Sequence, residues 1–110
     1  MAQITKAQSS SKAKTQKDGL LRILRENRAK FISRYHIKSL GLFGSYIRNE
    51  QNAGSDLDVL VEFEEQPSLF EFVRLQNELH DLIGIKVDLV MRDTLKPAIG
   101  KRILSEVVSV

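Results

Sequence analysis

The feature that most constrains the fold is the segment 57–63, in which apolar residues recur at every second position. Two closely spaced aspartates lie at its start, Asp56 just before it and Asp58 within it. The alternation in this segment, LDVLVEF, is typical of a strand with one face in the core. Successive side chains of a strand point to opposite faces, so Asp56 and Asp58 share a face, about 6.6 Å apart along the strand. Two carboxylates at that spacing can bind the same hard cation, typically Mg²⁺.

A small-residue turn, Gly44-Ser45, precedes these aspartates and follows an apolar segment. Such a turn can present backbone N–H groups to an anion. Gly44 would let the backbone approach a triphosphate, Ser45 adds a hydroxyl donor, and the fork of Arg48 suits phosphate oxygens. Each piece alone is more often an ordinary turn or a surface charge. Their combination with the two aspartates is more specific and indicates nucleotide chemistry.

A third carboxylate, Asp88, lies inside the apolar segment 85–91, which we predict to be a strand. A carboxylate there is costly unless it is paired or bound to a metal. If this strand lies beside 57–63, Asp88 joins the face that carries Asp56 and Asp58. The three would then supply oxygen ligands for two ions about 3.5–4 Å apart, and Asp88 could also accept a proton from an attacking hydroxyl.

Apolar spacing and turn residues predict the remaining elements. We expect a helix over 18–34 with Asp18 as its N-cap, a helix from Pro67 to a cap at Gly84, and a last helix capped by Thr94 with Pro97 in its first turn. We also expect a strand over 37–43, a brief helix over 45–50 and a loop over 51–54. The predicted buried stripes of the last two helices are Leu69, Phe72, Val73, Gln76, Leu79 and Ile83, and then Leu95, Ile99, Ile103 and Leu104.

Length and charge predict one folded domain, 18–110, after a disordered basic tail, 1–17. The chain has 110 residues and a net charge of +3, but four lysines of the tail precede the first acid. The remainder is close to neutral, so direct nucleic-acid binding is not expected. There is no apolar run near 18 residues, so we expect no membrane span, and zero cysteines fit a reducing cytoplasm. The helix 18–34 carries a row of arginines that is either a solvated face or a docking surface for an acidic partner: Arg22, Arg25, Arg28 and Arg34.

Three short motifs resemble the signature of polymerase-beta-type nucleotidyltransferases: Gly44-Ser45-Tyr46-x-Arg48, Ser55-Asp56-Leu57-Asp58 and Val87-Asp88-Leu89-Val90. The resemblance covers about residues 20–110 and is closest to the minimal, single-domain members of this superfamily. It implies an α+β class, a two-layer fold in which a small mixed sheet packs with helices. Two positions depart from the pattern, because Ile47 stands where many members have a small residue and Asn49 where many have glycine.

The resemblance also implies site residues and an activity. Gly44 and Ser45 would lie at the nucleotide phosphates, and Asp56, Asp58 and Asp88 would be the catalytic carboxylates and metal ligands. We assign Arg48 and Ser55 to the nucleotide-binding set as well. Minimal members are commonly the antitoxins of HEPN-domain ribonuclease toxins, which implies an enzyme that uses Mg²⁺, with two ions expected, and transfers AMP from ATP to a tyrosine of the toxin.

Two other functions remain open from the sequence alone. The chain could neutralise its toxin by occlusion, without catalysis. It could instead transfer a nucleotide to a small molecule such as an aminoglycoside, although little of this chain remains to form walls around a small acceptor. The intact Asp56, Asp58 and Asp88 favour the enzymatic hypothesis.

Overall fold

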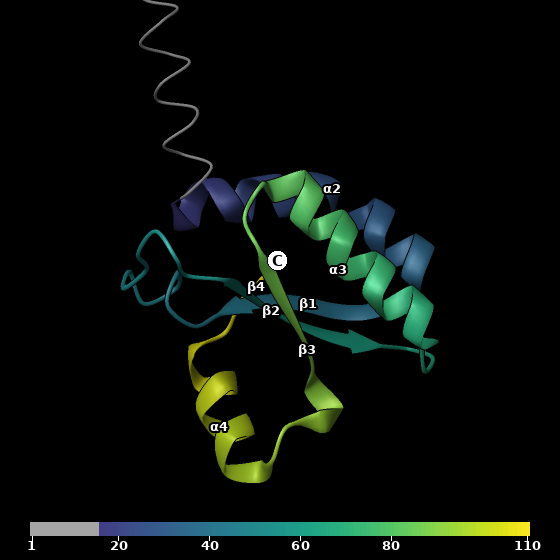
Figure 1. The fold of residues 1–110 in the computed structure, drawn as a ribbon. Helices are drawn as coiled ribbons and strands as arrows, with labels where there is room; N and C mark the ends of the chain where they lie inside the picture. Colours follow the sequence, from purple (N-terminus) through teal and green to yellow (C-terminus); the bar gives the residue numbers. More distant parts are fainter. Residues whose placement is uncertain (1–15) are drawn as a thin grey trace, which may run out of the picture.

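Four strands form one mixed sheet, and helices lie on both of its sides (Figure 1). The computed structural model describes residues 16–110, so the predicted tail lies outside the described residues apart from its last two positions. In chain order, the elements are α2 (Lys17–Tyr35), β1 (Ile37–Phe43), β2 (Leu57–Phe63), α3 (Leu69–Ile83), β3 (Val87–Met91), the 3₁₀ turn η1 (Arg92–Thr94), α4 (Pro97–Glu106) and β4 (Val108–Ser109). The predicted small mixed sheet is confirmed.

The strand order is β3-β2-β1-β4, with both antiparallel and parallel pairs. β1 is antiparallel to β2 and to β4, and Leu42 lies opposite Val59. β2 and β3 are parallel, and α3 forms the crossover between them. β3 therefore lies directly beside β2, which is the arrangement required for Asp88 to join the face of Asp58.

The core lies between the sheet and the pair α2 and α3, which cover the same face (Figure 1). The predicted inward side of β2 is confirmed, since Leu57, Val59 and Val61 are at most 1% exposed. Side chains of the two helices meet them there, among them Leu20, Leu24, Phe31, Leu75 and Leu79. Helix α4 lies on the opposite side of the sheet (Figure 1). The face that carries Asp58 is therefore turned away from the main core.

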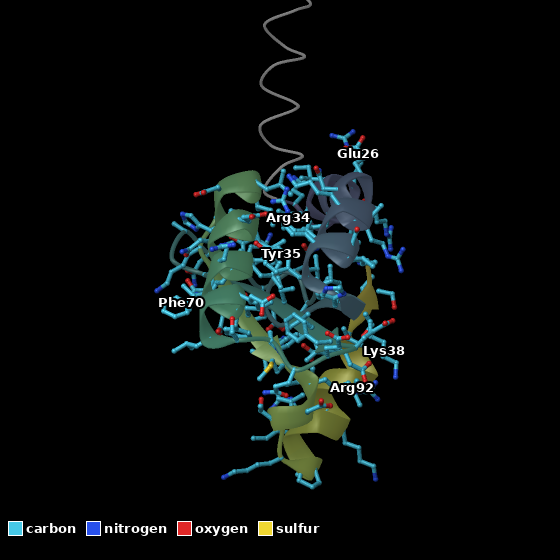
Figure 2. The ribbon with its side chains drawn as sticks, turned by 90° about the vertical axis from the view of Figure 1, so that its right-hand side faces the viewer. Glu26, Arg34, Tyr35, Lys38, Phe70 and Arg92 are labelled. Carbon is cyan, nitrogen blue, oxygen red and sulfur yellow. The ribbon has the colours of Figure 1, made fainter. Side chains whose placement is uncertain are left out.

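A three-residue cluster joins α2 to α3. Arg34 pairs with Glu78 at 2.9 Å, and the hydroxyl of Tyr35 donates to the same carboxylate at 2.8 Å. Burial and the bond to Glu78 raise the pKa of Tyr35 to about 12. Figure 2 shows Arg34 and Tyr35 between the two helices, whereas Phe70 of α3 points outward. Arg34 of the predicted docking row therefore has a structural role.

The helix ends correct several predicted caps. Gln16, not Asp18, is the N-cap of α2, because the helix begins at Lys17. Pro67 precedes the cap of α3, where Ser68 forms a reciprocal capping box with Glu71. Gly84 ends α3 in the left-handed conformation with φ of 79°, as predicted. Thr94 belongs to η1 and Lys96 is the N-cap of α4, with Pro97 in the first turn as predicted.

The remaining corrections concern burial and short elements. Residues 45–49 form turns and not a helix, β3 begins two residues later than expected, and β4 was not predicted. Leu69 and Val73 are 76% and 44% exposed, and in α4 Ile99 and Leu104 are 53% and 43% exposed. The α3 stripe is instead completed by the buried Leu75. Within residues 16–110, no helix combines the length and apolarity needed to cross a bilayer.

Candidate active site

Two of the three predicted carboxylates lie side by side. Asp58 of β2 and Asp88 of β3 are register partners in the parallel pair, so their side chains share one face of the sheet. Asp58 is partly buried and Asp88 is exposed on the edge strand. Asp56 comes directly before β2 and is partly buried as well. The expected adjacency of strands 57–63 and 85–91 is therefore what brings Asp58 and Asp88 together.

The electrostatic environment of Asp58 shows that these carboxylates repel one another. Its pKa rises from the ordinary value of 3.8 to about 6, first because of burial and then because of the charges of Asp88 and Asp56. Glu106 adds a smaller increase, and Arg48 acts in the opposite direction. Like charges held at close range favour protonation or the binding of a cation. Asp58 is therefore the electrostatic centre of the site.

The predicted phosphate loop begins directly against Asp58. Gly44 follows β1 with φ of 84°, a left-handed conformation that favours glycine. A Cβ at this position would overlap the carboxylate of Asp58, so the backbone approaches the carboxylate more closely than any side chain would allow. The carbonyl of Gly44 accepts bonds from the N–H groups of Ile47 and Arg48, both at 3.1 Å. The predicted phosphate loop at Gly44 and the predicted aspartate motif at Asp58 are therefore adjacent in the structure.

The two departures from the family pattern fit this loop. Asn49 has φ of 62°, a conformation that glycine adopts readily and that asparagine tolerates better than most residues. Ile47 is partly buried and packs against the core. The backbone conformation thus suits Asn49, and the core accommodates Ile47.

Arg48 contacts acidic side chains on both sides. Its Nε lies 3.0 Å from Glu50, and its Nη1 lies 3.0 Å from Oε2 of Glu106, the last residue of α4. The same Oε2 accepts the backbone N–H of Gly44 at 2.7 Å. Sequence reasoning missed Glu106, because it lies 58 positions from Arg48 and belongs to no motif. In the sequence, Glu106 is a single acidic residue at the end of a predicted helix, and nothing in that pattern indicates a contact with Gly44 or Arg48.

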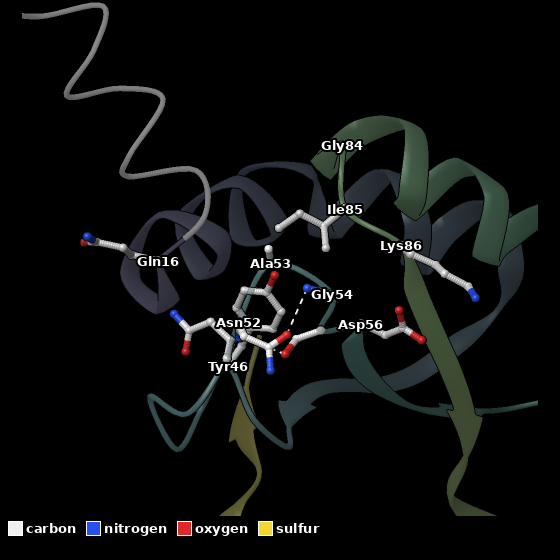
Figure 3. Close-up of a pocket in the computed structure, with 11 residues that line it drawn as sticks. Gln16, Tyr46, Asn52, Ala53, Gly54, Asp56, Gly84, Ile85 and Lys86 are labelled. Atoms are coloured by element: carbon white, nitrogen blue, oxygen red, sulfur yellow. Dashed lines mark hydrogen bonds between the residues drawn. The ribbon is translucent and has the colours of Figure 1, made fainter.

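Ser55 lies in the loop before Asp56. Its hydroxyl oxygen accepts the N–H of Asn52 at 2.9 Å, and Asn52 in turn accepts the N–H of Gly54 at 2.9 Å. This loop forms one wall of a cleft of about 640 Å³ whose other walls include Gly84 and Lys86 (Figure 3). The cleft touches Ser55 and Asp56 but not the other predicted site residues, so it does not include Asp58 or Asp88.

The donor set fits a hard divalent cation. Asp56, Asp58 and Asp88 offer only oxygen atoms, which Mg²⁺ prefers, and their mutual repulsion would be relieved by a cation. Within residues 16–110, no three His, Cys, Asp or Glu side chains form a preformed cage for an ion. Mg²⁺ is usually bound by one or two carboxylates together with substrate phosphates and water, which agrees with this open arrangement. The three-carboxylate metal site stays a prediction.

The raised pKa of Asp58 predicts a pH-dependent stability in chelator. Between about pH 4 and 6 the folded protein binds a proton at Asp58 that the unfolded chain releases, so this group lowers the free energy of unfolding as the pH rises through that window. Asp58→Asn should therefore be more stable than the parent at pH 7, by about 1–2 kcal/mol after allowance for solvent screening. The difference should disappear near pH 4. Urea unfolding of both proteins at the two pH values measures it, and an equal difference at both would contradict the assignment.

Comparison with known proteins finds similarity to nucleotidyltransferases. The family model described as "Nucleotidyltransferase domain" matches residues 20–110. A protein of Thermococcus cleftensis named protein adenylyltransferase MntA is 46% identical over 88 residues, which are 80% of this chain and 89% of the relative. A solved structure assigned as a minimal nucleotidyltransferase has a TM-score of 0.72 at 35% identity, covering 83% of this chain and 93% of that one.

A more distant structure shares the fold. A chain in the solved complex of the tri-AMPylated HEPN toxin of Shewanella oneidensis with an MNT antitoxin matches with a TM-score of 0.60 at 17% identity, covering 80% of this chain and 69% of that one. At that identity the likeness concerns the fold alone. The sequence match spans nearly all of the described residues, and it includes the loop at Gly44 and the strands of Asp58 and Asp88. This chain therefore belongs to the nucleotidyltransferase domain family.

Proposed function

We propose that this chain transfers AMP from ATP to a tyrosine of a HEPN-type toxin and thereby acts as its antitoxin. One observation carries the proposal: the glycine of the phosphate loop lies directly against Asp58, which pairs with Asp88 on the next strand. A triphosphate held at the loop would thus lie next to carboxylates suited to a cation. The relative named protein adenylyltransferase and the AMPylated toxin bound to an MNT antitoxin support AMP transfer to a protein.

The residues divide the chemistry between them. Gly44, Ser45, Arg48 and Ser55 would bind and orient the nucleotide, and Asp56, Asp58 and Asp88 would hold Mg²⁺. When bound, Mg²⁺ supplies Lewis-acid polarisation and neutralises charge on the phosphates. Asp88 is exposed on the edge strand, where the hydroxyl of another protein can reach it, and it would accept the tyrosyl proton. The tyrosyl oxygen forms a bond to the α-phosphorus while the bond to pyrophosphate breaks.

The open position of the carboxylates favours a protein acceptor over a small molecule. Transferases of small molecules need walls that hold and select the acceptor, and the cleft at Ser55 and Asp56 does not include Asp58 or Asp88. A toxin can supply its own surface. The arginine row of α2 remains a candidate contact for it, although Arg25 donates to the carbonyl of Ser109 at 2.7 Å and Arg34 pairs with Glu78. Arg22 and Arg28 are therefore the better residues for testing a contact with the toxin. A cytoplasmic location is a separate part of the proposal.

Isotope placement in ATP tests the proposed reaction. The chain is incubated with Mg²⁺ and its HEPN-type partner, once with ATP labelled at the α-phosphate and once with ATP labelled at the γ-phosphate. We expect the partner to acquire label from the first and none from the second, because pyrophosphate leaves. Replacing the acceptor tyrosine of the partner by phenylalanine should remove the label. Transfer from the γ-position, or label on this chain alone, would contradict the proposal.

A further inference from the structure

Glu106 reaches from the end of α4 into the predicted phosphate loop. Its Oε2 accepts the N–H of Gly44 at 2.7 Å and lies 3.0 Å from Nη1 of Arg48, while its Oε1 lies 3.2 Å from the same nitrogen. Helix α4 lies on the side of the sheet opposite α2 and α3, and its C-terminal end leads into β4 beside β1 (Figure 1). One carboxylate thus connects this helix to two groups assigned to the nucleotide.

The groups around Glu106 are of the kind that bind phosphate. A backbone N–H and a guanidinium fork both donate to anionic oxygens, and a carboxylate offers the same type of acceptor as a phosphate. The contact is accessible, since the side chains of Arg48 and Glu106 are 38% and 20% exposed. An external anion could therefore exchange with this carboxylate by rotation of side chains, without unfolding of an element.

The negative charge of Glu106 is unfavourable for Asp58. This residue adds negative charge near Asp58, which already faces Asp88 and Asp56. Arg48 and the N–H of Gly44 offset that charge in the protein without nucleotide. Glu106 therefore holds a negative charge on the N–H of Gly44 and the guanidinium of Arg48, although that charge is unfavourable for Asp58.

We propose that the carboxylate of Glu106 is an internal competitor for the phosphate site and that the triphosphate of the incoming nucleotide displaces it. The identity of the displacing anion rests on the proposed function, whereas the occupancy of the site by Glu106 does not. An anion can bind only to those molecules in which Glu106 has left the N–H of Gly44 and the guanidinium of Arg48. The apparent affinity for the anion is therefore reduced in proportion to the fraction of such molecules. The same carboxylate can return when pyrophosphate leaves, which opposes the reverse reaction.

Binding measurements on the full chain test this inference with two probes. Calorimetry with the magnesium complexes of AMP-PNP and of tripolyphosphate compares the parent with Glu106→Gln and with the shortened Glu106→Asp. We expect both variants to bind both probes about three- to tenfold more tightly, as for removal of an exposed competing contact. The second variant keeps the test available if the first fails to fold, which thermal unfolding will show.

Glu50→Gln is the matched control. Glu50 also pairs with Arg48, at 3.0 Å, but its side chain is 64% exposed and it does not contact the N–H of Gly44. Its replacement removes the same charge from the same arginine, and we expect a change of less than about twofold. A gain as large as that of Glu106→Gln would show a general charge effect and overturn the inference.

The other outcomes are distinct. Unchanged or weaker binding by the Glu106 variants would show that Glu106 holds the binding groups in place, and the inference would be wrong. Tighter binding of tripolyphosphate without binding of AMP-PNP would support the displacement of Glu106 and count against the proposed use of a nucleotide. If tripolyphosphate binds neither parent nor variant, these groups are not an anion site and the inference fails.

Discussion

Asp58→Asn is expected to reduce AMP transfer by on the order of 10³-fold, because it removes the central charge of the site. Asp58 touches the phosphate loop at Gly44 and pairs with Asp88, so no other carboxylate has the same two neighbours. Asparagine keeps the size of the side chain, so the fold should remain. Initial rates of label transfer from ATP measure the loss, and circular dichroism checks the fold.

Asp81→Asn is the control for this variant. Asp81 is exposed on α3, away from the sheet face of Asp58, and its replacement should leave the transfer rate within about twofold, as for most surface substitutions. An Asp58→Asn protein that kept more than about a tenth of the parent rate would contradict the catalytic assignment, since a factor of ten is only about 1.4 kcal/mol of barrier.

Gly44→Ala is expected to lower the free energy of unfolding by about 2–4 kcal/mol and to abolish nucleotide binding. The added Cβ would be strained at φ of 84° and would also overlap the carboxylate of Asp58. Relief of that overlap must move either the loop or Asp58, and both belong to the proposed site. Urea unfolding measures the stability, and calorimetry with AMP-PNP measures the binding.

Gly84→Ala separates the effect of backbone strain from the effect of the overlap with Asp58. Gly84 has a similar φ of 79°, but a Cβ there would meet nothing within 4 Å. Its replacement should cost about 1 kcal/mol through backbone strain alone and leave nucleotide binding unchanged. Equal losses of stability in the two variants would show that the contact with Asp58 does not contribute, and the close approach of the two motifs would not be needed for the fold.

The parts of the fold that could be predicted depend on local patterns. The strands 37–43 and 57–63 were predicted at their observed bounds, the first from an apolar segment that ends at Gly44-Ser45 and the second from its alternation of apolar residues. The glycine at position 84 and the proline at position 97 were predicted correctly because each has a strong local preference. Asp88 lies on the same face as Asp58 because β3 does pair beside β2, although Asp88 is exposed and not enclosed as a carboxylate in an apolar strand was expected to be.

The parts that were missed depend on contacts between distant segments. β4 has two residues and is stabilised by pairing with Gly41 and Leu42, so its own sequence carries no strand signal. Leu69 and Val73 fit a helical stripe, yet they are exposed because the core contacts of α3 come from Leu75, Leu79 and Ile83. Glu106 is positioned by α4 and β4 together, and only the structure brings it to Gly44.

The most direct test of the account is the intact mass of the HEPN-type partner before and after exposure to this chain with ATP and Mg²⁺. The protein encoded by the adjacent open reading frame is the expected partner, and its ribonuclease activity is assayed in the same samples. We predict that its mass rises by one or more whole AMP units as its activity is lost, and that Asp58→Asn prevents both changes. Loss of ribonuclease activity with an unchanged mass, using the parent chain and ample ATP and Mg²⁺, would contradict the account and establish neutralisation by occlusion.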